Sequence, residues 1–352
     1  MHNIKKFISL TLLAATPIMA FFALYAWLDP FCSLWRNPLL SPQQQLVNRS
    51  LLSTEVYLLN RHSQGYDSFI FGSSISGYFS IEVWKKHLPP HASAMHFDAS
   101  SETLQGIAQK IDFIIRQGGN LQNALIVIEE PMLRRSQNSI YHLYTPHPRL
   151  NGGGLHWIEF QHVNFTAFRQ IDFIKEHILK NAKPSPEKPT SPLNLITNEY
   201  DYADLEQYVV SQADNYYTPQ LLQKFEEYAP LFPQPPAPVE AFNLHWLKYI
   251  ATRLHQLRCN YAVIVLPTYR GAALDCLTAQ LMRSWFEKER VFDFTHDEWL
   301  KNNPRHYYDP VSHLRTPLCN QILQEVYAKP NPGLLYLTLP QEEKTPIFTD
   351  RR

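Results

Sequence analysis

Two segments far apart in the chain hold side chains suited to nucleophilic catalysis. Ser74 follows the apolar run of residues 68–71, and a serine at such a junction of strand and helix exposes its hydroxyl beside free backbone N–H groups. His313 and Asp309, near the other end of the chain, supply the base that a serine needs and the carboxylate that orients that base. The pattern predicts a Ser-His-Asp triad, with the N–H of Ser74 in an oxyanion hole.

Other interpretations of the polar residues compete with this one. A serine at position 74 also suits a simple helix cap. Glu129 and Glu130 form a carboxylate pair, but neighbouring strand residues point to opposite faces, which disfavours glycoside hydrolysis. Arg134 and Arg135 are candidates to bind an anionic glycan or phosphate, against the alternative of a solvated basic pair. The fifteen histidines show no ligand spacing, so we expect neither a metal site nor a cofactor.

The elements that would position these residues alternate between strand and helix. Continuous apolar runs favour strands that are covered on both faces by helices. The predicted strands are 68–71, 94–97, 124–128, 261–266 and 291–294, and the predicted helices are 43–60, a stretch from 73 to 84, 101–117, 241–256, 272–287 and 317–328. The sequence therefore predicts an α/β fold, a doubly wound three-layer sandwich around a parallel sheet of about five strands. Functional residues are expected beyond the carboxyl ends of those strands.

The regular alternation is interrupted in the middle of the chain, where turn-forming and proline-rich stretches dominate. We interpret this segment as a mostly irregular or helical insertion. The predicted organisation is 1–30 as a cytoplasmic stub and transmembrane anchor, 31–140 as the first half of the α/β domain, 141–240 as the Pro-rich insertion, 241–328 as the second half and 329–352 as a tail.

The N-terminal segment has the pattern of a membrane anchor. The 22 residues from Phe7 to Leu28 include no charged side chain, and at 1.5 Å per residue they would cross a hydrocarbon core of ~30 Å. Lys5 and Lys6 precede the run, which predicts a cytoplasmic N-terminus and an extracytoplasmic domain, periplasmic or on the cell surface. A cleaved signal peptide is the alternative, although the apolar run exceeds the usual length and lacks a clean cleavage site.

Composition excludes several classes of protein. Lys plus Arg and Asp plus Glu both number 32, so no overall positive charge attracts nucleic acid. The four cysteines include no C-x-x-C pair, which argues against a zinc ribbon or a dithiol redox site. Buried thiols or a disulfide among Cys259, Cys276 and Cys319 both remain open.

The Gly-Ser-Ser block at residues 72–74, together with the C-terminal Asp309 and His313, resembles the SGNH/GDSL hydrolase superfamily. The resemblance covers roughly residues 29–130 and 240–328, and its membrane-anchored envelope branch is the most similar. That branch includes the teichoic-acid D-alanylation proteins and the alginate and peptidoglycan O-acetylation proteins, in which an Asp-Pro-aromatic segment like residues 29–31 follows an anchor. The resemblance implies an acyl-ester hydrolase or O-acyltransferase that acts on cell-envelope polysaccharide, with a multi-span membrane acyltransferase as partner.

The chain also departs from this family pattern. The family implies a second oxyanion donor near Ser100, but its usual asparagine donor is replaced at the third block by Glu129 and Glu130, which cannot donate when ionised. Asp309 and His313 are four positions apart instead of the usual three. A catalytically silent glycan-binding or scaffolding module is therefore the rival hypothesis. A hydroxyl of Ser74 within ~3.5 Å of His313 would favour the enzyme, and a separation above ~8 Å would favour the rival.

Overall fold

The computed structural model describes residues 2–41, 46–135, 141–175, 191–229 and 239–328. The predicted tail, 329–352, lies outside the described residues, as do residues 43–45 of the first predicted helix and most of the two proline-rich stretches of the predicted insertion.

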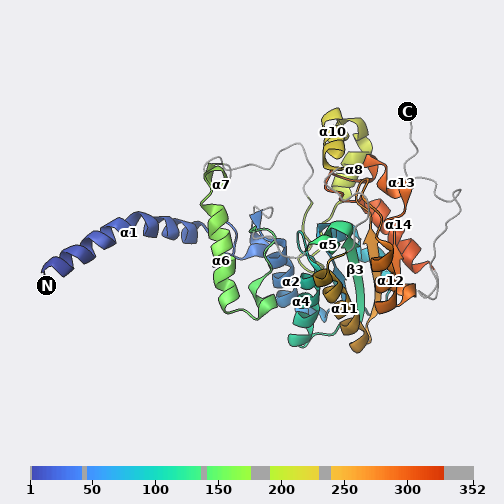
Figure 1. The fold of residues 1–352 in the computed structure, drawn as a ribbon, viewed down its shortest axis with the longest axis horizontal. Helices are drawn as coiled ribbons and strands as arrows, with labels where there is room; N and C mark the ends of the chain where they lie inside the picture. Colours follow the sequence, from blue (N-terminus) through green and yellow to red (C-terminus); the bar gives the residue numbers. More distant parts are fainter. Residues whose placement is uncertain (1, 42–45, 136–140, 176–190, 230–238, 329–352) are drawn as a thin grey trace.

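A five-stranded parallel sheet forms the centre of the molecule (Figure 1). Its strands are β1 (Ser68–Phe71), β2 (Ala94–His96), β3 (Asn123–Glu129), β4 (Asn260–Leu266) and β5 (Val291–Asp293), in the spatial order β2-β1-β3-β4-β5. Every residue of β1 and β3 is buried, as expected for strands covered on both faces. The predicted α/β class and the parallel five-stranded sheet are confirmed.

Helices cover both faces of this sheet. The helices are α1 (His2–Leu28), α2 (Arg49–Gln64), α3 (Ile81–Lys85), α4 (Leu104–Arg116), α5 (Glu130–Arg134), α6 (Leu155–Phe168), α7 (Ile171–Phe173), α8 (Ala203–Ser211), α9 (Ala213–Tyr216), α10 (Pro219–Tyr228), α11 (Ala241–Gln256), α12 (Cys276–Trp285), α13 (Glu298–Lys301) and α14 (Thr316–Tyr327). Short 3-10 turns are η1 (Pro38–Leu40), η3 (Ser74–Tyr78), η4 (Pro148–Asn151), η7 (Lys288–Arg290) and η8 (Pro304–His306).

Two hydrophobic clusters lie on opposite faces of the sheet. Alternate residues of a strand point to opposite faces, so Phe69 and Phe71 join one cluster while Ile70 joins the other. The first cluster buries the apolar sides of α2, α4, α11 and α12, and the second buries those of α3 and α14. The sheet is thus the middle of three layers.

Capping residues determine where several helices begin. The sequence predicts a helix from residue 101, but Ser101 has a positive φ of 50° and Thr103 is extended, so α4 starts only at Leu104. The Thr103 hydroxyl accepts a hydrogen bond from the N–H of Gly106 at 3.0 Å. In the same way, Asp275 caps α12, which therefore begins at Cys276, four residues later than predicted.

The predicted insertion contributes to the core. Leu150 and Phe160 belong to the first hydrophobic cluster, and Phe225 of α10 belongs to the second. In Figure 1, α6 lies beside the end of α1. The same view shows α8 and α10 together at one end of the sheet. This segment is more helical than its composition suggests, since α6 alone extends over 14 residues.

α1 extends away from the body of the molecule (Figure 1). Its last turns pack against α6 through aromatic rings, with Phe22 stacked on Phe165 at 4.2 Å between centroids. After the helix, the carboxylate of Asp29 accepts hydrogen bonds from four successive backbone N–H groups, those of residues 33–36. Among the described residues, no helix combines the length and the apolarity that a membrane crossing requires. All four cysteines are free thiols, and only Cys276 is exposed.

Candidate active site

The turn after β1 holds Ser74 close to the end of the sheet. Gly72 is required there, because a Cβ atom at this position would lie 2.7 Å from both the Val127 carbonyl oxygen and the Cβ of Ser76. Ser73 then caps the turn η3, since its hydroxyl accepts from the N–H of Ile75 at 3.4 Å. The cap is therefore Ser73, which leaves the hydroxyl of Ser74 available for other contacts.

The structure brings the three predicted triad residues together. The Oγ atom of Ser74 lies 2.8 Å from Nε2 of His313, although the two residues are 239 positions apart. Nδ1 of the same imidazole lies 2.6 Å from Oδ2 of Asp309. This is the order of contacts in which a carboxylate fixes the imidazole tautomer and the imidazole accepts the proton of the serine.

The extra residue between Asp309 and His313 is accommodated in a tight turn. The N–H of Ser312 donates to the Asp309 carbonyl at 3.1 Å, and Ser312 itself has a positive φ of 72°. Val311 is pushed outward and is 48% exposed. The Ser312 hydroxyl accepts from the N–H of Tyr269 at 2.9 Å, which ties the turn to the chain just beyond β4. The four-residue spacing is therefore compatible with the triad geometry.

His313 is surrounded by groups that act on its pKa in opposite directions. Burial lowers the pKa of the imidazole, because it disfavours the charged form. The hydrogen bond and negative charge of Asp309 raise it, and the charge of Glu129 adds to this effect. The net result is a His313 pKa above its usual value of 6.5, so the imidazolium form is stabilised.

Backbone donors lie at the two predicted oxyanion positions. Within the described part of the chain, neither the N–H of Ser74 nor that of Ser100 donates a backbone hydrogen bond, whereas the N–H of Ala99 donates to the Gly72 carbonyl at 3.3 Å. Ala99 thereby joins the Ser100 loop to the turn that precedes Ser74. Both N–H groups are therefore left without a backbone acceptor, as a donor to a substrate oxygen has to be.

Glu129 and Glu130 form ion pairs with the two arginines at the C-terminal end of α5, Arg134 in its last turn and Arg135 directly after it. At the end of β3, Oε2 of Glu129 accepts from the Ser73 hydroxyl at 2.8 Å, and Oε1 lies 3.6 Å from Nη2 of Arg135. Arg134 pairs with Glu130, and burial raises the pKa of the Glu130 carboxyl although Arg134 opposes that shift. Both arginines, predicted to bind an anionic substrate, thus make ion pairs within the protein.

Some neighbours of the site could not be recognised from the sequence. The ring of Tyr78 lies 5.3 Å from that of His313 and stacks at 4.3 Å on Tyr202, which belongs to the predicted insertion. Tyr308 packs against Tyr78 at 5.2 Å. Tyr78 and Tyr308 stand within the two motifs that predict the triad, but nothing in the pattern around Tyr202 indicates its place.

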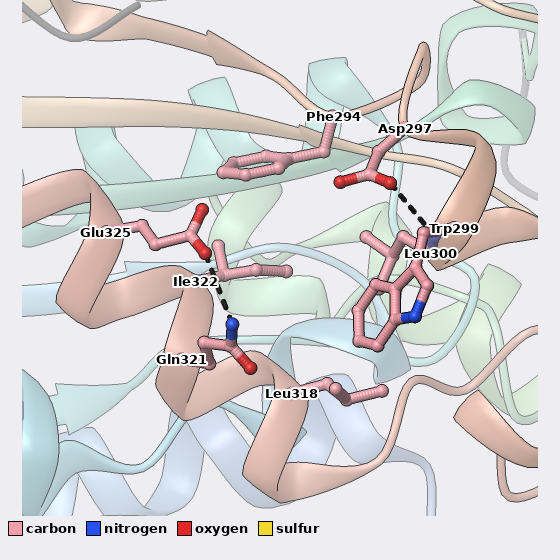
Figure 2. A pocket seen from close by; sticks show the side chains of 8 residues that line it. All are labelled: Phe294, Asp297, Trp299, Leu300, Leu318, Gln321, Ile322 and Glu325. Atoms are coloured by element: carbon pink, nitrogen blue, oxygen red, sulfur yellow. Dashed lines mark hydrogen bonds between the residues drawn. The ribbon is translucent and has the colours of Figure 1, made fainter. Parts of the chain in front are cut away.

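A small hollow elsewhere in the molecule has no part in this arrangement. It lies between α14 and the segment that includes α13, and Figure 2 shows the eight side chains that line it. Its volume of about 20 Å³ suffices for a single water molecule. None of its lining residues belongs to the triad. Across the described ranges, no group of three or more His, Cys, Asp or Glu side chains is arranged to hold a metal ion.

Comparison with protein families, with curated proteins and with solved structures finds no match for this chain.

Proposed function

We propose that this chain is a serine acyl-ester enzyme of the SGNH/GDSL type, either an acyl-ester hydrolase or an O-acyltransferase. The observation that carries the proposal is the continuous hydrogen-bonded series from Ser74 through His313 to Asp309, with contacts of 2.8 and 2.6 Å. A parallel sheet with the nucleophile after its first strand and the acid and base near the C-terminus supports the same assignment.

The proposed reaction proceeds through an acyl-enzyme. Oγ of Ser74 attacks the acyl carbonyl carbon while Nε2 of His313 takes the hydroxyl proton, and the carbonyl oxygen becomes an oxyanion held by the N–H groups of Ser74 and Ser100. His313 then returns the proton to the departing alcohol oxygen as the ester bond breaks. A second hydroxyl, from water or from a sugar, attacks the acyl-enzyme by the reverse sequence and releases Ser74.

The oxyanion hole of this proposed enzyme has one hydrogen-bond donor fewer than the SGNH/GDSL pattern provides. Glu129 stands where that pattern places an asparagine, and its carboxylate accepts a hydrogen bond from Ser73 instead of donating one. Loss of one such donor costs about 10² to 10³ in kcat, so we expect a slow enzyme. The 2.8 Å contact between Ser74 and His313 nevertheless favours catalysis over the silent glycan-binding or scaffolding alternative.

The substrate class and location of the reaction follow from the resemblance and the N-terminal segment. We propose O-acyl groups on a cell-envelope polysaccharide as substrate, a multi-span membrane acyltransferase as partner, and α1 as an anchor that keeps the domain outside the cytoplasm. Apolar side chains exposed along α1, among them Phe7, Leu13 and Trp27, support contact with lipid.

The decisive experiment is labelling of the purified full chain with a fluorophosphonate, which reacts with an activated serine whatever the natural substrate. Ser74→Ala is expected to abolish labelling, since loss of the serine nucleophile from a triad costs about 10⁶ in kcat. Ser284→Ala, which changes an exposed serine of α12, is the matched control and should leave labelling intact. Full labelling and full esterase activity in Ser74→Ala would refute the proposal.

A further inference from the structure

The loop that presents the N–H of Ser100 is held by buried charges at both of its ends. The carboxylate of Asp98 pairs with Arg49 through contacts of 2.8 and 3.0 Å, and the carboxylate of Glu102 lies 2.5 Å from Nζ of Lys110. All four side chains of these two ion pairs are at most 8% exposed. Pairs so deeply buried allow little freedom of position, because separation would leave an uncompensated charge.

Arg135 connects this loop to the nucleophile turn. Its Nη1 donates to the Glu102 carbonyl at 2.8 Å, and its Nη2 lies 3.6 Å from Oε1 of Glu129. The other carboxylate oxygen of Glu129 accepts from the hydroxyl of Ser73, the residue that precedes Ser74. One guanidinium thus joins the two chain segments that carry the proposed oxyanion donors.

We propose that Arg135 is a positioning residue that holds the N–H groups of Ser74 and Ser100 in register, a role that rests on the proposed serine chemistry. Oxyanion stabilisation depends on donors that are already oriented before the charge develops. This site has only two backbone donors. Their relative position therefore matters more than it would in a site with a third donor to the oxyanion. A displacement of about 1 Å in a catalytic group is sufficient to cost about 10²-fold in rate.

The test uses the purified full chain and p-nitrophenyl acetate, an uncharged ester. Arg135→Gln is expected to lower kcat by about 10- to 100-fold while KM changes less than about twofold, because the donors act on the transition state and not on the bound ester. Arg149→Gln, which removes an exposed arginine, is the control and should keep both constants. Thermal unfolding followed by circular dichroism verifies that each variant is folded.

Two further variants separate positioning from general support of the fold. Arg135→Lys keeps the positive charge beside Glu129, but its ammonium lacks the two separate nitrogens that reach Glu102 and Glu129, so kcat should again fall about tenfold. Arg135→Lys also takes the place of Arg135→Gln in the kinetic comparison if Arg135→Gln does not fold. Ser73→Ala breaks the same connection at its other end, so the effects of Ser73→Ala and Arg135→Gln on kcat should be less than additive.

The outcomes distinguish this inference from the proposed function. A kcat within twofold of the unaltered chain in Arg135→Gln, or full additivity with Ser73→Ala, would overturn the positioning role. A KM raised tenfold at unchanged kcat would instead make Arg135 a residue that binds the ester, and would equally overturn the positioning role. Retention of activity in Ser74→Ala would refute the serine chemistry itself.

Discussion

His313 combines three properties that a general base in a triad needs. It lies 2.8 Å from the hydroxyl that it would deprotonate, its second nitrogen is 2.6 Å from Asp309, and its side chain remains 18% exposed to solvent. The types and neighbours of Ser74, His313 and Asp309 in the sequence predict that these residues meet, and the structure places them in contact. The four-residue spacing departs from the family pattern, and the structure accommodates it in a turn where Ser312 has a positive φ and its hydroxyl contacts the chain after β4.

The raised pKa of His313 leads to a prediction about pH. Because the base must be neutral to accept a proton, activity should fall on the acid side with a midpoint above 6.5. Asp309→Asn removes the hydrogen bond to a carboxylate and its charge, so this midpoint should move to lower pH while kcat falls by about 10⁴. A kcat–pH profile of both proteins, measured with the same uncharged ester, tests the shift. A midpoint that stays in place would show that Asp309 does not control His313.

At the scale of secondary structure, α8 and α9 hold the segment that carries Asp309 and His313. The hydroxyl of Tyr216 donates to the Tyr308 carbonyl at 2.7 Å, and that of Tyr217 lies 2.9 Å from the Tyr307 carbonyl. Glu206 of α8 forms an ion pair with Arg315 and accepts a hydrogen bond from the Tyr308 hydroxyl. The predicted insertion is therefore part of the support of the site, which its proline-rich composition gave no means to predict.

Tyr217 provides the test of this support. Burial raises the pKa of Tyr217 to about 12, so its hydroxyl keeps its proton near neutral pH and continues to donate. Tyr217→Phe removes that hydroxyl, so the buried carbonyl groups that accept from it lose a hydrogen bond. This loss should lower the free energy of unfolding by about 1–3 kcal/mol. It should also lower kcat several-fold, because the turn of Asp309 and His313 loses a fixed contact. Urea denaturation and esterase assays measure the two effects.

The control for that experiment is Tyr228→Phe. Tyr228 is exposed at the end of α10, so loss of its hydroxyl should change neither stability nor rate. If Tyr217→Phe and Tyr228→Phe had the same free energy of unfolding and the same kcat, a supporting role for α8 and α9 would be contradicted.

At the scale of the whole molecule, α1 extends away from the body, and its last turns pack against α6 (Figure 1). If α1 anchors the chain, the full-length protein should remain with membranes after an alkaline carbonate wash. Deletion of residues 2–20 removes most of the exposed apolar side chains but leaves Phe21 to Leu28 in contact with α6, so the shortened chain should be released and still react with the fluorophosphonate. A full-length chain that the wash releases would refute the anchor while leaving the serine chemistry untouched.

Local pattern was sufficient to predict the five strands, the parallel sheet and the longer helices that cover its two faces, but not the short helices of the predicted insertion. Continuous apolar runs and the 3.6-residue period record which faces are buried, and burial is the main source of folding free energy. The approach of Ser74 to His313, the pairing of Arg135 with Glu129 and the place of Tyr202 depended on contacts between segments distant in the chain. Such contacts leave no periodic signal, because each is fixed by the packing of the whole molecule.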